Sequence, residues 1–340
     1  AASDVYKRQK FNSSIQEIEN ADAILLVGSN PRWEASVLNA RIRKAYINNN
    51  CKVGVIGPDL DLNYPYTKIS NSLSGLNDIK EKKSEFSNIF HNSKNPLIII
   101  GTSAINNSEG ASVLKLCADI AKKLPNYSNT FNPLNILNQD ISRVGSLELG
   151  FVNKYFDKNF EENLKENIKT NKPVIFLLGL DEIDPKNLEQ AFVVYIGHHG
   201  DLNAQHADII LPSPAYTEKT STFMNIEGRV IQTSRCHNPL GEAKEEWKIF
   251  RVLSDLMNCD LQFNNLNDVR KYLVDNNKNF LQILECNNTS NLSFASPEVI
   301  TEHTIEYNIS NFYMNDSISR SSETMANCTN EILNKTKKAS

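Results

Sequence analysis

The sequence has no closely spaced cysteine pair, and this limits the chemistry that the chain can carry. Iron–sulfur clusters and structural zinc sites need several thiolates in one small volume, and spacings such as C-x-x-C usually supply them. Scattered cysteines in a chain of 340 residues do not form the disulfide framework of a small secreted protein either. We therefore expect no metal site and a reducing compartment. The six cysteines stand singly, as Cys51, Cys117, Cys236, Cys259, Cys286 and Cys328.

Long apolar runs and an excess of basic residues are also lacking. No segment approaches the roughly 20 consecutive apolar residues of a membrane-spanning helix, and the longest runs, at 23–27 and 97–100, have the length of strands. The formal net charge is −4, so no basic field attracts nucleic acid or anionic lipid. We expect no nucleic-acid partner and no direct membrane insertion, so that any membrane association goes through partner subunits.

The chain does contain a repeated alternation of short apolar runs and amphipathic stretches. Residues 23–28 and 52–57 read as strands buried on both faces, and 34–48 has apolar positions at helical spacing. Strand, helix and strand at this spacing predict a βαβ unit. Further strand patterns occupy 97–101, 173–179, 192–196 and 207–212, and further helical patterns occupy 76–90, 109–123 and 242–257. The predicted fold class is α/β and Rossmann-like, with mostly parallel sheets and helices on both faces.

We divide the chain into four parts. Residues 1–9 are polar and match nothing that follows, so we interpret them as a foreign or disordered lead-in. Residues 10–95 and 96–262 are predicted to form two α/β subdomains. Residues 263–340 are predicted to hold one helix at 269–281 and then a poorly ordered tail. That tail is rich in Asn, Ser and Thr and buries too little apolar surface to offset its ordering entropy.

The turn from Gly28 to Trp33 lies where a Rossmann unit contacts a pyrophosphate. It has one glycine, so the G-x-G-x-x-G pattern is absent. The second strand ends at Gly57, where a ribose-binding acid is expected. Both features weigh against a nucleotide-binding Rossmann protein. We interpret the segment as a structural turn with Trp33 packed against a neighbour.

We interpret three groups of reactive side chains as structural and not as metal-binding or catalytic sites. His198 and His199, with His206 nearby, are types that bind metals, but adjacent residues at a strand end point to opposite sides. Cys236 and His237 lack a third group that would orient a nucleophile. Four charged residues are interpreted as ion pairs that fix a loop, because catalysis would need a pocket and perturbed acidities. These residues are Glu218, Lys219, Glu227 and Arg229.

Several motifs in a fixed order resemble the molybdopterin-oxidoreductase superfamily, which has the fold of formate dehydrogenase and DMSO reductase. They are GSNP at 28–31, VIGP at 55–58, ADIILP at 207–212 and EKTSTFMNIEGR at 218–229. Other motifs look like the version of this fold in respiratory complex I, the proton-pumping NADH:quinone oxidoreductase. They are NPRWEASVLNARIR at 30–43, DLNY at 61–64, SRVGSLELGF at 142–151, FLLG at 176–179 and GHHGD at 197–201.

This resemblance implies a C-terminal fragment of the large peripheral-arm subunit of complex I. In that family the N-terminal half holds the 4Fe–4S and 2Fe–2S clusters, and the present region is a cofactor-free relic of a molybdenum enzyme. We accordingly predict no catalytic, cofactor-binding or metal-binding residue here, and a structural and assembly role beside the electron chain. The residues carried over as structural or interface positions are Asn30, Arg32, Trp33, Glu34, Asp208, Thr222, Asn225, Glu227 and Arg229.

The resemblance also implies partners and a location. The partners are other peripheral-arm subunits of complex I. The location is peripheral, on the cytoplasmic face of the bacterial inner membrane or the matrix side of the mitochondrial one. The main alternative is a fragment of a catalytic molybdopterin oxidoreductase such as a formate dehydrogenase, which needs an intact pterin site and a metal ligand. A scaffold outside respiration also stays open.

Overall fold

The computed structural model describes residues 10–141, 143–151, 160–180, 183–200, 202–281, 283, 300, 303–307, 309 and 311–334. The chain divides into two compact units. Unit 1 consists of Ala1–Val152, Phe223–Ile231 and Gln282–Ser310. Unit 2 consists of Asn153–Thr222, Gln232–Leu281 and Asn311–Ser340. The predicted lead-in, 1–9, lies outside the described residues.

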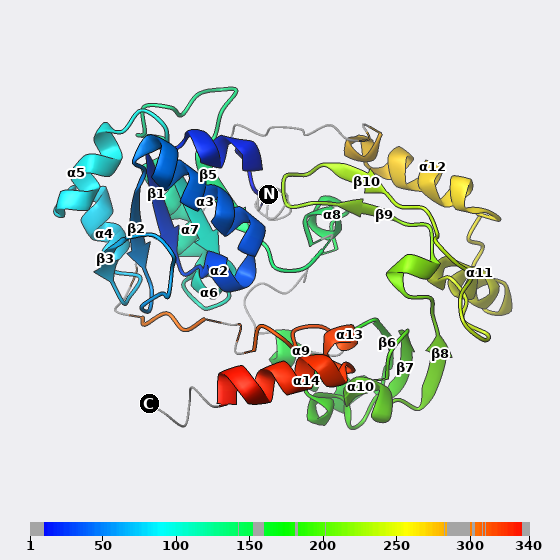
Figure 1. Ribbon diagram of the computed structural model, residues 1–340. Helices are drawn as coiled ribbons and strands as arrows, with labels where there is room; N and C mark the ends of the chain where they lie inside the picture. The colour runs from blue at the N-terminus through cyan, green and yellow to red at the C-terminus, as the bar shows by residue number, and fades with distance from the viewer. Residues whose placement is uncertain are drawn as a thin grey trace. The chain divides into compact units, whose positions relative to one another are not determined.

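Unit 1 is built on a five-stranded parallel sheet with the strand order β3-β2-β1-β4-β5 (Figure 1). All five residues of the central strand β1 are buried, because both of its faces are covered. Its neighbours β2 and β4 pair with it over its whole length. The strands are β1 (Ala23–Val27), β2 (Lys52–Ile56), β3 (Thr67–Ser70), β4 (Pro96–Gly101) and β5 (Leu134–Leu137).

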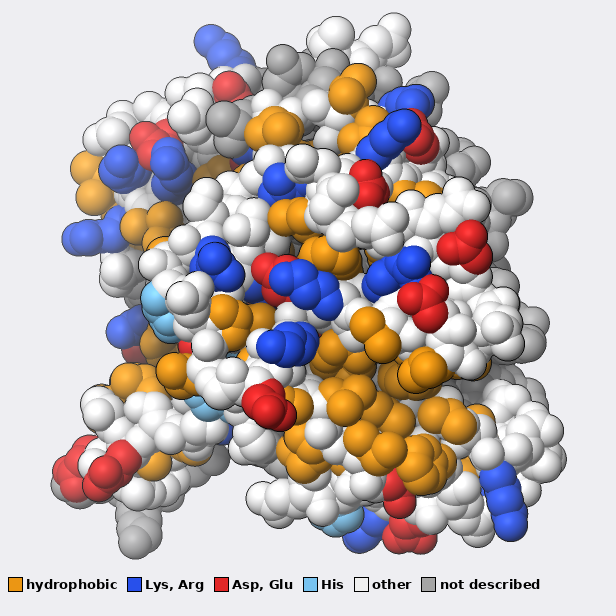
Figure 2. All heavy atoms as spheres, turned by 90° about the vertical axis from the view of Figure 1, so that its right-hand side faces the viewer, with side chains coloured by type: hydrophobic (Ala, Val, Ile, Leu, Met, Phe, Trp, Pro, Cys, Tyr) orange, Lys and Arg blue, Asp and Glu red, His pale blue; other side chains and the backbone are white. Residues whose placement is uncertain are grey.

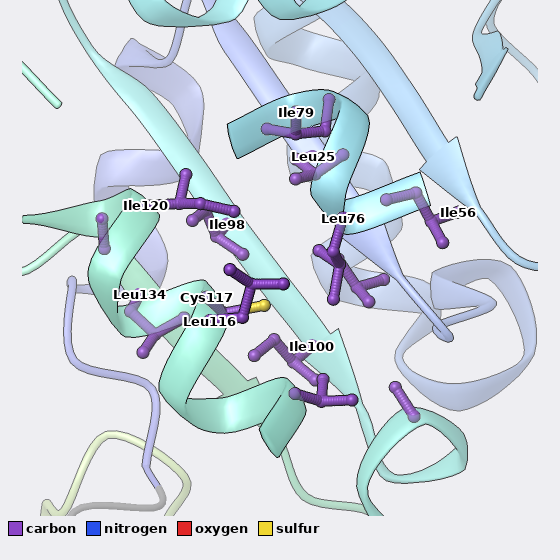
Figure 3. Packing of buried hydrophobic residues seen from close by; sticks show 14 of the residues in the cluster. Leu25, Ile56, Leu76, Ile79, Ile98, Ile100, Leu116, Cys117, Ile120 and Leu134 are labelled. Atoms are coloured by element: carbon purple, nitrogen blue, oxygen red, sulfur yellow. The ribbon is translucent and has the colours of Figure 1, made fainter. Parts of the chain in front are cut away.

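Helices cover both faces of this sheet, as predicted, and create two cores. Alternate residues of a strand point to opposite faces, so Leu25 enters one core and Ile24 enters the other. In the first core, Leu25 and Ile98 pack with α7 (Gly110–Ala121) and α4 (Gly75–Lys80) (Figure 3). The second core is formed with η1 (Ile15–Asn20) and α3 (Ser36–Asn49). The remaining helices of unit 1 are α2 (Pro31–Glu34), α5 (Glu85–Asn92), α6 (Thr102–Ile105) and α8 (Arg143–Glu148).

Unit 2 contains a three-stranded parallel sheet with the order β6-β7-β8. Ile168 of α9, Leu188 of η2 and Ala204 of α10 pack against one face of this sheet. The strands are β6 (Val174–Leu178), β7 (Phe192–Gly197) and β8 (Ile209–Pro212). The helices are α9 (Phe160–Asn171), η2 (Pro185–Leu188), α10 (Leu202–Gln205), η3 (Tyr216–Glu218), α11 (Glu246–Leu256), α12 (Leu266–Asn276), η4 (Lys278–Phe280), α13 (Ser317–Arg320), α14 (Glu323–Cys328) and η5 (Thr329–Leu333).

The division into units differs from the predicted boundary between 95 and 96. That boundary falls within one sheet, because β1 pairs with β2 on one side and with β4 on the other. The predicted boundary between 262 and 263 falls inside one segment of unit 2. Units assembled from segments far apart in sequence cannot be located from composition along the chain.

The C-terminal region also differs from the prediction of a poorly ordered tail. The predicted helix at 269–281 begins earlier, at Leu266, because Asn265 and Asp268 form a capping box. Three further helical segments follow between Ser317 and Leu333. Among the described residues of the chain, no helix combines the length and the apolar character that crossing a membrane requires.

Candidate functional site

The site that a ligand would use in unit 1 is the carboxyl end of β1 and β4. The chain runs outward from β1 to β2 and β3, and then returns to place β4 on the other side of β1. In open α/β sheets, ligands bind outside the carboxyl ends of the strands at such a reversal of strand order. The turn after β1, which contains the predicted residues Asn30 to Glu34, lies at this switch point.

Protein atoms fill the space next to this turn. Gly28 has a φ of 56°, and a Cβ placed on it would lie 2.7 Å from the Cβ of Ala104 in α6. A Cβ on Gly101, at the end of β4, would lie 2.1 Å from the carbonyl oxygen of Gly28. The two glycines therefore bring two turns of the protein into contact. In a dinucleotide-binding fold, glycine at this turn brings the backbone against a pyrophosphate instead.

The Glu34 carboxylate accepts the hydrogen bonds that the donors of this turn could otherwise give to a bound anion. Its two oxygens accept hydrogen bonds from the Ser29 hydroxyl, at 2.9 Å, and from the Asn30 backbone N–H, at 3.2 Å. Burial raises the pKa of Glu34, and these two hydrogen bonds oppose that shift. The turn thus carries its own carboxylate in the position where backbone N–H groups otherwise contact phosphate.

These residues do not fit the pterin cofactor that the superfamily resemblance implies. Its phosphates would meet the Glu34 carboxylate, and the N–H of Asn30 is already bound. The side-chain oxygen of Asn30 is buried and has no hydrogen-bond partner within the described part of the chain. The other two predicted residues of the turn lie at its surface. Arg32 is exposed and pairs with Asp61, and Trp33 is half-buried.

Asn225, Glu227 and Arg229 lie together in a β-hairpin formed by β9 (Thr222–Met224) and β10 (Val230–Gln232). The Asn225 side-chain oxygen accepts from the backbone N–H groups of Glu227, at 3.0 Å, and Arg229, at 2.9 Å. Its Nδ2 donates to the Glu227 carboxylate at 3.0 Å, and Arg229 approaches the same carboxylate at 3.7 Å. Thr222 begins β9 and is half-buried.

The tip of this hairpin docks on the first described segment of unit 1. The other oxygen of Glu227 accepts from the Ile15 backbone N–H at 2.8 Å. The Ile226 carbonyl accepts from the Phe11 N–H at 2.7 Å. Glu227 and Phe11 are both buried, so the motif joins distant parts of unit 1 and presents no open acid to a substrate.

In unit 2, Asp208 connects two strands. Its carboxylate accepts from the Val193 N–H at 2.7 Å, and its own N–H donates to the Val193 carbonyl at 2.9 Å. Ion pairs were predicted for Glu218, Lys219, Glu227 and Arg229, and Arg229 and Glu227 pair with each other in unit 1. Lys219 pairs with Glu246, and Glu218 caps η3 through the Ala215 N–H at 3.0 Å.

The histidines after β7 depart from the predicted geometry. The Nδ1 atoms of His198 and His199 lie 2.7 Å apart, because β7 ends at Gly197 and the alternation of a strand no longer holds. His206 is separate, with its Nδ1 2.9 Å from the Leu202 carbonyl. No group of three His, Cys, Asp or Glu side chains able to hold a metal occurs in the part of the chain that the structure describes.

Cys236 and His237 are engaged with different groups. The His237 Nδ1 lies 3.0 Å from the Asn238 carbonyl and 3.9 Å from the Glu218 carboxylate. The Cys236 sulfur lies 4.0 Å from the Ser234 carbonyl. No hydrogen bond between this thiol and this imidazole is found among the described contacts, so the pair lacks the geometry of an activated nucleophile.

One residue at the neighbouring end of β2 was missed in the sequence. The Tyr307 hydroxyl donates to the Pro58 carbonyl at 3.3 Å, and a Cβ on Gly57 would lie 3.0 Å from that hydroxyl. Tyr307 lies in the segment that we predicted to be a poorly ordered tail. The alternation of Ile305 and Tyr307 with polar residues was the available signal, because it is typical of a half-buried extended segment.

Residues 1–256 match the family model of molybdopterin oxidoreductase, and residues 286–328 match a second family model, which describes the C-terminal region of an NADH-ubiquinone oxidoreductase chain. The protein is 37% identical to the NADH-ubiquinone oxidoreductase 78 kDa subunit, mitochondrial, of Candida albicans, over 96% of this chain and 45% of the relative. It is 38% identical to the NADH-ubiquinone oxidoreductase 75 kDa subunit of Reclinomonas americana, over 93% of this chain and 46% of the relative.

A third relative is NADH dehydrogenase [ubiquinone] iron-sulfur protein 1, mitochondrial, of Solanum tuberosum, at 34% identity over 94% of this chain and 42% of the relative. The chain thus spans somewhat less than half the length of these relatives. The resemblance read from the motifs is confirmed, and the chain belongs to the molybdopterin oxidoreductase family, in the branch that contains the large subunits of NADH-ubiquinone oxidoreductase.

Proposed function

We propose that this chain forms a structural body of the large iron–sulfur subunit of proton-pumping NADH:quinone oxidoreductase and carries no catalytic residue or cofactor. Two of the three relatives are named subunits of NADH-ubiquinone oxidoreductase, and the third is named an iron–sulfur protein of NADH dehydrogenase [ubiquinone]. Hydride oxidation and electron transfer then take place in other parts of the complex. The role of this chain is to support and dock the section that holds the clusters, whose surroundings control their potential and solvent access.

The observation that carries the docking role is an apolar surface on unit 2. Parallel sheets are normally buried on both faces, but β6 exposes Val174 at 57%, Phe176 at 41% and Leu178 at 55%. On α11, which reaches this sheet through a contact of the Phe250 and Phe176 rings, the residue Leu256 is 77% exposed. Figure 2 shows hydrophobic side chains gathered on the side of unit 2 that carries α11 and β8. Exposed apolar surface of this kind is typical of a protein–protein contact.

We assign this surface to the section of the same subunit that the relatives have beyond the span of this chain. A covalently linked section is present at high effective concentration, so it competes well against other partners. Other peripheral-arm subunits are then further partners. The location is peripheral, on the cytoplasmic face of the bacterial inner membrane or the matrix side of the mitochondrial one.

The test places one charge on this surface in the full-length subunit. Leu256→Glu is expected to lower the amount of assembled complex by at least tenfold, because an unpaired charge in a buried contact costs several kcal/mol and about 1.4 kcal/mol already corresponds to a factor of ten. Assembly is measured by native gel electrophoresis, and NADH:quinone activity is expected to fall in parallel. The matched control is Val37→Glu, at a position of α3 in unit 1 that is 75% exposed. Normal assembly with Leu256→Glu would contradict the docking role.

The alternative, a catalytic molybdopterin oxidoreductase, is not favoured. The relatives are named as NADH-ubiquinone oxidoreductase subunits, and the Glu34 carboxylate occupies the donors of the turn at the switch point.

A further inference from the structure

A short segment near the C-terminus lies against the carboxyl edge of the unit 1 sheet. We name residues 303–307 the strap. The His303 carbonyl accepts from the Leu73 N–H at 3.1 Å, and the Ile305 N–H donates to the Asn71 carbonyl at 3.2 Å. An antiparallel bridge joins Ser72 to Thr304 between these two bonds. The strap is therefore fixed by backbone pairing to the loop that follows β3.

The side chains of the strap reach both cores of unit 1. Ile305 is 1% exposed and belongs to the core that contains Leu73 and Leu76. Tyr307 packs against the other core. The two cores lie on opposite faces of the sheet, since alternate residues of β1 enter each of them. The strap therefore crosses from one face to the other over the ends of the strands.

The Tyr307 ring lies where β2 ends. Its hydroxyl donates to Pro58 and touches the position that a Cβ of Gly57 would occupy. Burial raises its pKa, and so do the nearby charges of Glu34 and Asp59. In dinucleotide-binding folds, the end of the second strand is the place of the ribose, next to the pyrophosphate turn. The Tyr307 phenol and the Glu34 carboxylate together lie where a ribose and a phosphate would be expected.

The origin of the strap in the sequence adds an independent observation. It lies within residues 286–328, which match the C-terminal NADH-ubiquinone oxidoreductase model, and outside residues 1–256, which match the molybdopterin oxidoreductase model. The segment that covers the end of β2 thus comes from a part of the chain outside the match to the wider family.

We propose that the strap replaces a bound nucleotide-type ligand in unit 1, with Ile305 as its anchor and Tyr307 as the group that fills the ligand position. This deepens the proposed function, because it names the element that keeps the fold closed without a cofactor. The C-terminal segment then stabilises the carboxyl edge of the unit 1 sheet through the contacts of Ile305 and Tyr307.

The test is hydrogen exchange of the full 340-residue chain, read at peptides that cover 28–34 and 57–62. Tyr307→Ala is expected to speed exchange about tenfold or more in both peptides, because truncation leaves a cavity at the edge and local opening becomes easier. Exchange in unit 2 stays unchanged. Tyr313→Ala is the matched control, since Tyr313 is a half-buried tyrosine of the same C-terminal region within unit 2.

Two further variants keep the outcome decisive. Tyr307→Phe retains the ring and is expected to alter exchange at 57–62 by about twofold, since one neutral hydrogen bond contributes little net. If Tyr307→Ala does not fold, Tyr307→Leu is used in its place, and faster exchange confined to the two peptides is expected. If either truncation left exchange in these two peptides unchanged, the proposed role of the strap would be wrong. The measurement does not depend on assembly, so its failure is distinguishable from failure of the docking role.

Discussion

At the scale of single residues, the protein uses its own side chains where the fold would place a ligand. Glu34 binds the donors of the β1 turn, and Tyr307 lies against the end of β2. Glu227 joins a hairpin to the first described segment. The sequence predicted structural roles for Glu34 and Glu227 and no role for Tyr307. Their hydrogen-bond partners show that each one holds backbone in place.

Glu34 gives a prediction about pH. Burial raises its pKa above the ordinary value of 4.5, so the folded protein binds this proton more tightly than the unfolded chain does. The stability that it contributes is fully present below the unfolded pKa and is lost as pH rises through the folded pKa. Glu34→Gln keeps an oxygen acceptor and cannot titrate. The free energy of unfolding of the wild type relative to this variant should therefore fall between about pH 4 and about pH 7.

Denaturant titrations of both proteins at the two pH values measure this difference. A difference that stays constant, or that grows as pH rises, would show that the Glu34 pKa is not raised.

At the scale of elements, the strands with continuous apolar sequence were the predictable part. The runs that begin at Ala23, Lys52 and Pro96 are strands of unit 1, and those that begin at Val174 and Phe192 are strands of unit 2. Burial on both faces imposes this composition on four of these strands, whereas β6 has the same apolar composition but exposes Val174, Phe176 and Leu178. The predicted α/β fold class is confirmed for the same reason.

The elements that were missed have weaker patterns. β3 (Thr67–Ser70) lies at the edge of the sheet and has no fully buried residue. β5 (Leu134–Leu137) has only four residues and includes Asn135, whose side-chain oxygen accepts a hydrogen bond from the Ser13 backbone N–H at 2.8 Å. The predicted helix at 76–90 is divided into α4 and α5, because a capping box at Ser84 begins a new helix. Tertiary contacts decide such cases, and a single sequence does not contain them.

The contact between the β1 turn and the end of β4 gives a prediction at this scale. A side chain at Gly101 would push the two turns apart, since its Cβ would lie 2.1 Å from the Gly28 carbonyl oxygen. We expect Gly101→Ala to lower the free energy of unfolding by about 3 kcal/mol, at the upper end of the usual cost of overpacking. Thermal and denaturant unfolding of the chain measure the loss.

Gly200→Ala is the matched control, because a Cβ there meets no atom within 4 Å. Its effect is expected to stay within about 0.5 kcal/mol. Equal effects of the two substitutions would contradict the close approach of the turns.

At the scale of the whole molecule, the order of the motifs was enough to recognise the family. The sequence did not predict which chain segments make up each of the two units. Unit 1 gathers three segments, the last of which contains the strap. The predicted residues Asn225 and Glu227 belong to the same unit as the β1 turn, although about two hundred positions separate them in the sequence. Only the fold brings these segments together. The sequence motifs were therefore enough to identify the family but did not predict the contacts between distant segments of unit 1.

We propose that this nucleotide-type fold holds no redox centre of its own. The most direct measurement is the molybdenum, iron and pterin content of the 340-residue chain, purified from a host that makes the pterin cofactor. Elemental analysis and the fluorescence of oxidised pterin should both give amounts far below one per chain. Molybdenum and pterin near one per chain, retained through purification, would show that the fold still binds the cofactor.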